Sequence, residues 1–101
     1  MKSGYEIRWT PEAEKSFDAI ISYLEEKWTE KEVKKFVQKT FKILSHIKIN
    51  PEQFQASKVN NVRKALITKH NSLFYYINEE SKIIELYSFW DNRQDPSKLS
   101  F

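Results

Sequence analysis

Two amphipathic stretches with helical periodicity follow one another in the first half of the chain, with only a turn between them. Residues 11–28 and residues 30–48 each place their apolar side chains on one face. Each stretch begins with a possible helix cap: Thr10 is followed by a proline, and Thr29 precedes Glu32 at the spacing of a capping box. Because so short a connection favours antiparallel packing, the pattern predicts a two-helix hairpin with one apolar face.

The hydrophobic period changes from 3.6 to 2 in the second half, where three strands are predicted. They cover residues 62–68, 72–78 and 82–89, with polar turns between them. A further strand, residues 4–9, precedes the first helix. The order strand, helix, helix, strand, strand, strand predicts an α+β domain (βααβββ). We expect the last three strands to form an antiparallel meander, the helices to pack on one sheet face, and the first strand to join at a sheet edge.

Length and composition favour a single small domain covering residues 1–101. The aromatic content of 15% excludes a disordered chain. No run approaches 18 apolar residues and the first residues lack the apolar segment of a secretion signal, so we expect a cytoplasmic protein without membrane association. The absence of cysteine excludes disulfides and zinc–thiolate sites.

Positive charge is concentrated in the second predicted helix. Residues 29–49 hold six lysines and two glutamates, although the whole chain has a net charge of only +3. Five of these lysines lie away from the apolar face of the helix: Lys31, Lys34, Lys35, Lys39 and Lys42. Such a stripe is typical of a solvated helix surface, and it also suits contact with an acidic partner or with nucleic acid.

Aromatic side chains are too numerous for one face of the predicted sheet. Eight lie in or beside the predicted strands: Tyr5, Trp9, Phe74, Tyr75, Tyr76, Tyr87, Phe89 and Trp90. Either all of them are core residues, or some form a binding surface on the open face of the sheet.

Few side chains suggest catalysis. One glycine in the chain excludes a glycine-rich phosphate loop, and two histidines without carboxylates at ligand spacing argue against a metal site, so no cofactor is expected. Arg63 lies near the start of one strand and Arg93 just after the end of another. If these strands are neighbours, we expect both guanidinium groups near one end of the sheet, where they either hold a phosphate or form ion pairs with carboxylates.

Three motifs together resemble the RelE/ParE superfamily of bacterial toxins. Residues 9–13 (Trp-Thr-Pro-Glu-Ala) lead into the first helix, and residues 62–64 (Val-Arg-Lys) open the sheet ahead of a tyrosine-rich strand. Residues 89–96 (Phe-Trp-Asp-Asn-Arg-Gln-Asp-Pro) are similar to the ParE-like branch, in which an arginine follows the last strand. The resemblance covers about residues 5–98.

The resemblance implies a growth-inhibiting toxin of a type II toxin–antitoxin (plasmid stabilisation) module, held in a hetero-oligomer by an antitoxin that wraps around it. ParE-like members poison DNA gyrase, whereas RelE-like members cut mRNA in the ribosome without a metal. No His, Tyr or Glu follows Arg93, which favours the ParE-like branch. A ribosome-dependent endonuclease is the alternative, and a member whose activity has decayed is a third possibility.

The resemblance and the predicted strand ends together give the candidate site residues. The candidates for target binding are Arg63, Lys64, Trp90 and Arg93. If the protein is a nuclease, the catalytic candidates are Arg63, His70, Tyr76 and Arg93. The candidates for antitoxin contact, around a groove between the helix hairpin and the sheet edge, are Phe17, Leu24, Trp28, Tyr75 and Tyr87.

Overall fold

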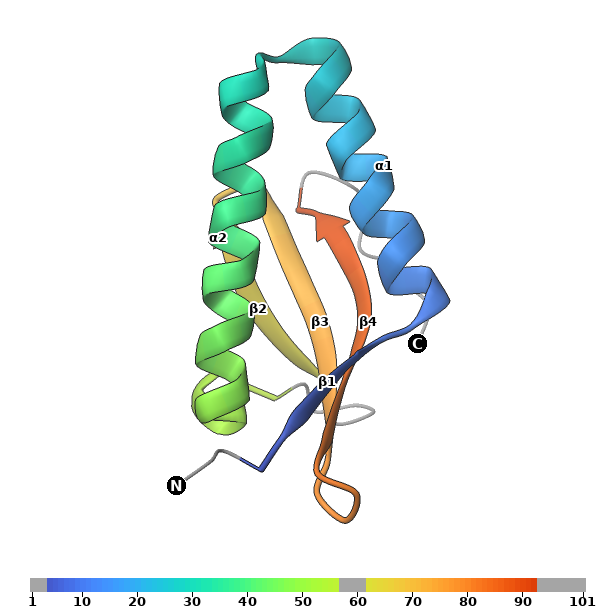
Figure 1. Ribbon diagram of the computed structural model, residues 1–101, viewed down its shortest axis with the longest axis vertical. Coiled ribbons are helices and arrows are strands. Elements are labelled where there is room, and N and C mark those ends of the chain that lie inside the picture. Colours follow the sequence, from blue (N-terminus) through green and yellow to red (C-terminus); the bar gives the residue numbers. More distant parts are fainter. Residues whose placement is uncertain (1–3, 57–61, 93–101) are drawn as a thin grey trace.

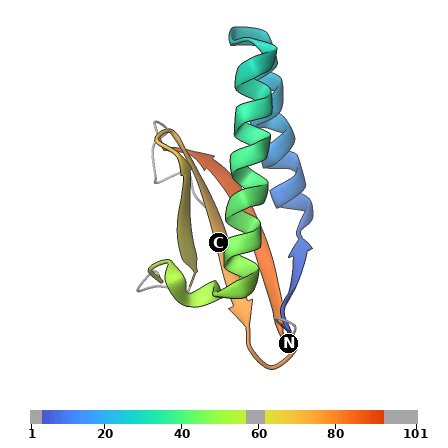
Figure 2. The same ribbon diagram turned by 60° about the vertical axis from the view of Figure 1, so that its left-hand side comes forward.

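A four-stranded sheet carries two helices on one face in the computed structural model, which describes residues 4–56 and 62–92 (Figures 1 and 2). The elements are β1 (Glu6–Trp9), α1 (Pro11–Lys27), α2 (Glu30–Ile49), a short 3-10 helix (Pro51–Gln53), β2 (Arg63–Thr68), β3 (Asn71–Asn78) and β4 (Ile83–Asp91). The predicted α+β order is therefore confirmed. Among the described residues, no helix has the length and apolar character needed to cross a membrane.

The strand order in the sheet is β1-β4-β3-β2. β2, β3 and β4 form the predicted antiparallel meander, and β1 joins at an edge as predicted, where it runs parallel to β4. Short turns join β2, β3 and β4, because antiparallel neighbours need only a tight turn. The parallel pair of β1 and β4 requires a long connection, which here starts with the helix hairpin.

The two predicted helix caps have different outcomes. Thr10 caps α1: its hydroxyl accepts a hydrogen bond from the Ala13 amide at 3.1 Å and donates to the Leu86 carbonyl at 2.6 Å, which ties the helix start to β4. Thr29 is the N-cap of α2, but its side chain makes no capping hydrogen bond, so the predicted capping box is wrong. Thr29 and Glu30 are exposed at the hairpin tip, where water can satisfy the first amides of the helix.

The core lies between the helices and the sheet. It contains Leu73, Tyr75 and Ile77 of β3, Ile84 and Leu86 of β4, and Phe36, Leu44 and Ile47 of α2, among others. Full burial of each aliphatic side chain contributes about 1.5–3 kcal/mol. The rings of Phe36 and Phe89 in the core and of the partly buried Trp9 and Phe17 form a contiguous aromatic cluster.

A bulge in β4 changes which side chains face the helices. Tyr75 pairs with Leu86 and Phe74 pairs with Ser88, so Tyr87 has no partner in β3. Consequently Leu86 and Phe89 both lie in the core although they are three residues apart, which simple alternation does not predict.

The helix hairpin is longer than the sheet beneath it. In Figure 1 the ends of α1 and α2 that meet at the tip extend past the end of the sheet at which β4 finishes. The helix surfaces near the tip therefore have no sheet to cover them.

Candidate binding groove

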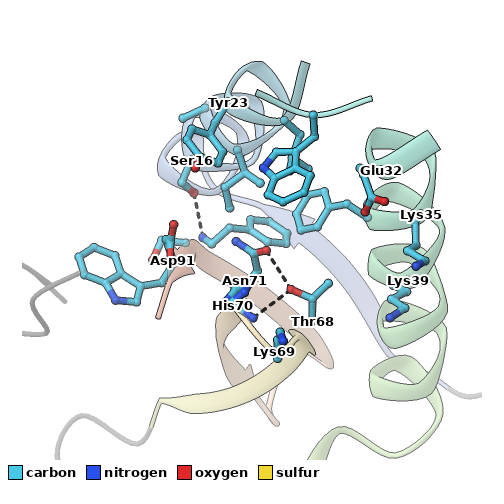
Figure 3. Close-up of a pocket in the computed structure, with 18 of the residues that line it drawn as sticks. Ser16, Tyr23, Glu32, Lys35, Lys39, Thr68, Lys69, His70, Asn71 and Asp91 are labelled. Atoms are coloured by element: carbon cyan, nitrogen blue, oxygen red, sulfur yellow. Dashed lines mark hydrogen bonds between the residues drawn. The ribbon is translucent and has the colours of Figure 1, made fainter. Parts of the chain in front are cut away.

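A groove lies where the helix hairpin extends past the sheet. Its walls are α1 and α2, and its floor is the β2–β3 turn and the last residues of β4 (Figure 3). Its volume is about 1130 Å³. Pockets for small ligands usually have about 300–1,000 Å³, so the groove is large enough for a segment of another protein.

The α1 wall of the groove is largely apolar, with Ala19, Ile20, Tyr23, Leu24 and the C-cap residue Trp28. The α2 wall adds Phe36 among three charged side chains. Trp28 is 56% exposed and Tyr23 is 42% exposed. Large apolar side chains left this open on adjacent turns of a helix form a surface that a partner can cover.

Hydrogen bonds fix the polar floor. The Thr68 hydroxyl donates to the Asn71 side-chain oxygen at 2.9 Å and accepts from the His70 amide at 3.2 Å (Figure 3). The His70 carbonyl accepts from the Asn92 amide at 2.7 Å. The β2–β3 turn is therefore held rigidly against the end of β4.

Ser16 joins the α1 wall to the floor. Its hydroxyl oxygen accepts a hydrogen bond from the Phe89 amide at 2.8 Å, and the hydroxyl donates to the Glu12 carbonyl of its own helix at 2.8 Å (Figure 3). β1 ends at Trp9, so no strand pairs with β4 beyond Leu86 on this side. A helix side chain takes the place of the missing strand partner.

Charges of both signs line the groove, with a small excess of lysine. The basic side chains are Lys15, Lys35, Lys39 and Lys69, and the acidic ones are Glu12, Glu32 and Asp91. Lys35 and Lys39 project from α2, opposite the α1 wall (Figure 3). An occupant with an apolar face and some acidic side chains would match this lining.

The structure does not support the predicted meeting of the two arginines. β2 and β4 are not neighbours, because β3 lies between them, and both run antiparallel to β3. The register places Arg63, at the start of β2, level with Tyr75 and Leu86, which is five residues before Asp91 at the end of β4. Arg93 itself lies outside the described residues.

Arg63 has a structural partner instead. Its guanidinium donates to the Phe54 carbonyl at 2.6 Å and more weakly to the Glu52 carbonyl at 3.3 Å. These bonds hold the segment after α2 against the first residue of β2. On the sheet, Arg8 and Glu85 form an ion pair at 3.7 Å.

Tyr75, one of the candidate antitoxin contacts, has no exposed surface. Tyr75 is completely buried, and its hydroxyl donates to the Pro51 carbonyl at 2.7 Å. Burial raises the pKa of Tyr75 to about 12, although the nearby positive charge of Arg63 acts in the opposite direction. A side chain enclosed in this way has no surface to offer a partner.

The other four candidate contacts occupy three different places. Leu24 and Trp28 line the groove. Phe17 is half-buried in the aromatic cluster. Tyr87 stacks on Tyr76 with ring centroids 6.3 Å apart, and burial, followed by the charge of Glu85, raises its pKa.

The remaining candidates are also separated. His70 and Trp90 line the groove, whereas Lys64 is exposed on β2. Tyr76 pairs with Glu85 and lies six residues after His70, which belongs to the β2–β3 turn. The structure therefore does not bring His70, Tyr76 and Arg63 together. Among the described residues, no group of three or more acidic or histidine side chains could hold a metal.

Sequence reasoning missed several residues that shape the groove. Ser16, Thr68 and Asn71 have no distinctive pattern around them. Their roles arise from the β4 edge and from the turn, which only the three-dimensional arrangement defines.

The family model for the ParE toxin of the type II toxin–antitoxin system parDE matches residues 7–96. None of the curated proteins matches the chain in sequence.

Solved structures resemble the fold at low sequence identity. A chain of the chromosomal ParDE system of P. aeruginosa has a TM-score of 0.73 at 18% identity, over 89% of this chain and 98% of that one. The YoeB dimer of S. aureus gives 0.60 at 20% identity, over 85% and 94% of the two chains. The RelBE2 toxin–antitoxin complex of M. tuberculosis gives 0.54 at 16% identity, over 86% and 96%. At these identities the likeness concerns the fold alone.

Proposed function

Because the chain belongs to the ParE toxin family of type II toxin–antitoxin systems, we propose that it inhibits DNA gyrase and that a cognate antitoxin neutralises it. The observation that carries this proposal is the ParE family match, which begins in β1 and continues beyond β4. As a gyrase inhibitor the protein would act in the cytoplasm, arrest growth and stabilise any plasmid that encodes the pair.

The groove supports the antitoxin part of the proposal. It has an apolar wall with exposed Trp28 and Tyr23, and it exceeds the usual size of a small-ligand pocket. Of the structures that resemble this fold, the ParDE structure is described as a toxin–antitoxin system and the RelBE2 structure as a toxin–antitoxin complex. We therefore assign the groove to the antitoxin, in a hetero-oligomer.

The separation of the candidate catalytic groups favours gyrase over mRNA as the target. A general base needs its proton donor within hydrogen-bonding distance, directly or through one water. His70 and Tyr76 lie six residues apart, and the Arg63 guanidinium is engaged by backbone carbonyls. The described candidates therefore do not form a preassembled site with an acid, a base and a phosphate-binding group, which a ribosome-dependent nuclease would need.

Two assays with the same purified chain separate the two targets. In the first, gyrase supercoils relaxed plasmid DNA, and we expect loss of supercoiling together with trapped double-strand breaks. In the second, ribosomes translate a defined mRNA, and we expect the mRNA to remain intact. Cleavage of the mRNA in the ribosomal A site with normal supercoiling would establish the nuclease alternative. Normal results in both assays would indicate a member without activity.

Arg93 is our candidate for the residue that toxicity requires. Arginine can bind a carboxylate or phosphate through two parallel hydrogen bonds, and Arg93 follows the groove-lining end of β4 in sequence. We expect Arg93→Ala to lose growth inhibition while antitoxin binding is kept.

A matched control is Arg8→Ala, which removes an arginine from an exposed pair with Glu85. An exposed ion pair contributes about 0–1 kcal/mol, so this variant should fold and remain toxic. Full toxicity of Arg93→Ala, or loss of its fold, would show that Arg93 does not act on the target.

A further inference from the structure

The lysine stripe of α2 is a surface that the groove explains only in part. Lys31, Lys34, Lys35, Lys39 and Lys42 are all exposed. At 100° per residue they fall within a sector of about 140°, opposite the buried side chains Phe36, Thr40, Leu44 and Ile47. From first to last they extend about 17 Å along the helix axis.

The positive charge of the stripe is not neutralised within the described residues. No aspartate or glutamate occurs between Val33 and Ile49. Glu30 and Glu32 lie in the first helical turn, and the ion pair found in the described part of the chain, between Arg8 and Glu85, involves none of these lysines. The stripe is therefore a row of cations without fixed counter-charges.

A regular polyanion matches such a row better than a folded acidic surface does. Every turn of the helix from Lys31 to Lys42 carries at least one of the five lysines, and Gln38 on the same face can donate a hydrogen bond to an anion. A hollow on this face is lined by one carboxylate, Glu30, and by Lys31, Lys34, Lys35 and Gln38. Acidic protein surfaces present charges of mixed sign at irregular spacing, whereas a phosphate backbone presents one sign at constant spacing.

The composition of the stripe favours a double strand over a single strand. Proteins that bind single strands stack successive bases on aromatic side chains. α2 has one exposed aromatic side chain beside the stripe, Phe41, and its ring packs near that of Trp9 with centroids 6.5 Å apart, so the stripe has no row of rings for successive bases. It also has no arginine, the residue most often used to read bases. Lysines alone gain affinity by releasing counterions, and duplex DNA carries about one charge per 1.7 Å of its axis.

We propose that the lysine stripe of α2 binds the phosphate backbone of duplex DNA without sequence preference. Lys35 and Lys39 also line the groove, so the stripe borders the surface that we assign to the antitoxin. DNA binding by the stripe does not depend on which enzyme the toxin inhibits, and it would hold the protein on DNA whatever its target.

The test measures binding of the full-length chain to a fluorescein-labelled 20-base-pair duplex by anisotropy, between 50 and 200 mM salt. If all five lysines contact phosphates, a plot of log affinity against log salt has a slope of about −4.5. A variant that combines Lys31→Gln, Lys34→Gln and Lys42→Gln leaves the two groove-lining lysines in place. Its slope should fall to about −2, with weaker binding at every salt concentration.

The matched control removes the same charge elsewhere. Lys27→Gln, Lys48→Gln and Lys82→Gln change exposed lysines outside the stripe and the groove. This variant should keep the slope of the parent chain, and circular dichroism checks that all three proteins are folded. The proposal is overturned if the parent chain does not bind the duplex at 50 mM salt, if both variants weaken binding equally, or if a 20-nucleotide single strand binds more tightly than the duplex.

Discussion

The two ends of the helical layer differ in how completely the sheet covers them. Near the C-terminal end of α2, Tyr75 and Ile47 are fully buried, and the Tyr75 hydroxyl and the Arg63 guanidinium both donate to backbone carbonyls. At the hairpin tip, Trp28 is 56% exposed and the helices face an open groove. The apolar face of the hairpin therefore serves two purposes. The part over the sheet stabilises the fold, and the part at the tip remains available to a partner.

A matched pair of leucine substitutions gives the largest expected difference between the two ends. Leu73 is fully buried in the core, whereas Leu24 is half-buried in the groove wall. Leu73→Ala should lower the free energy of unfolding by about 2–5 kcal/mol, because it leaves a cavity. Leu24→Ala leaves no enclosed cavity and should cost about 1 kcal/mol or less. Urea unfolding measures both, and equal losses would remove the distinction between the two regions.

The end of the helical layer that the sheet covers contains Tyr75, and its titration should change the stability of the protein at alkaline pH. The pKa of Tyr75 is about 12 in the folded chain and about 10 when unfolded. The folded state therefore holds the Tyr75 proton more tightly. The resulting contribution to the free energy of unfolding is fully present below pH 10. As the pH rises from 10 to 12, about 2–3 kcal/mol of stability should be lost.

Tyr75→Phe is the control for this titration. It should be less stable near neutral pH by about 1 kcal/mol, because the Pro51 carbonyl loses its donor. Its stability should then change less between pH 10 and 12 than that of the parent chain. Parallel pH profiles for the two proteins would show that other groups, such as lysines, cause the alkaline loss.

Ser16 connects the two regions, and its removal should have an intermediate effect. Ser16→Ala leaves the Phe89 amide without its acceptor and should cost about 1–2 kcal/mol. Ser45→Ala, on the exposed surface of α2, removes only a bond to its own helix and should change stability by less than about 0.5 kcal/mol. If thermal unfolding shows the same small shift for both, Ser16 does not anchor α1 to β4.

The smallest effect on stability is expected at the open end. Trp28→Ala should change the free energy of unfolding by no more than about 0.5 kcal/mol, because the ring is mostly exposed. If the antitoxin covers the groove, the same variant should bind it at least about 30-fold more weakly, which corresponds to about 2 kcal/mol. Isothermal titration with the antitoxin measures this loss.

Ile49→Ala is the apolar control for Trp28→Ala. Ile49 is 75% exposed at the far end of α2 and does not line the groove. Its replacement should leave antitoxin affinity unchanged. A similar loss of affinity in both variants would place the antitoxin on a wider surface than the groove.

The sequence by itself determined the elements, their order and the family. Helical and strand periods are local properties of the chain, so the hairpin, the meander and the approximate ends of each element followed from residue spacing alone. The prediction that β1 lies at an edge was confirmed, as was the cap at Thr10.

Only the tertiary structure decided which of these residues meet. The position of β3 between β2 and β4 separates Arg63 from the end of β4, and the bulge at Tyr87 brings both Leu86 and Phe89 into the core. Tyr75 belongs to an aromatic run that suggested a surface, yet it is buried because the segment after α2 closes over it. These outcomes depend on strand order, register and the relative lengths of helix and sheet. All three are set by contacts between residues far apart in the chain, which local patterns do not encode.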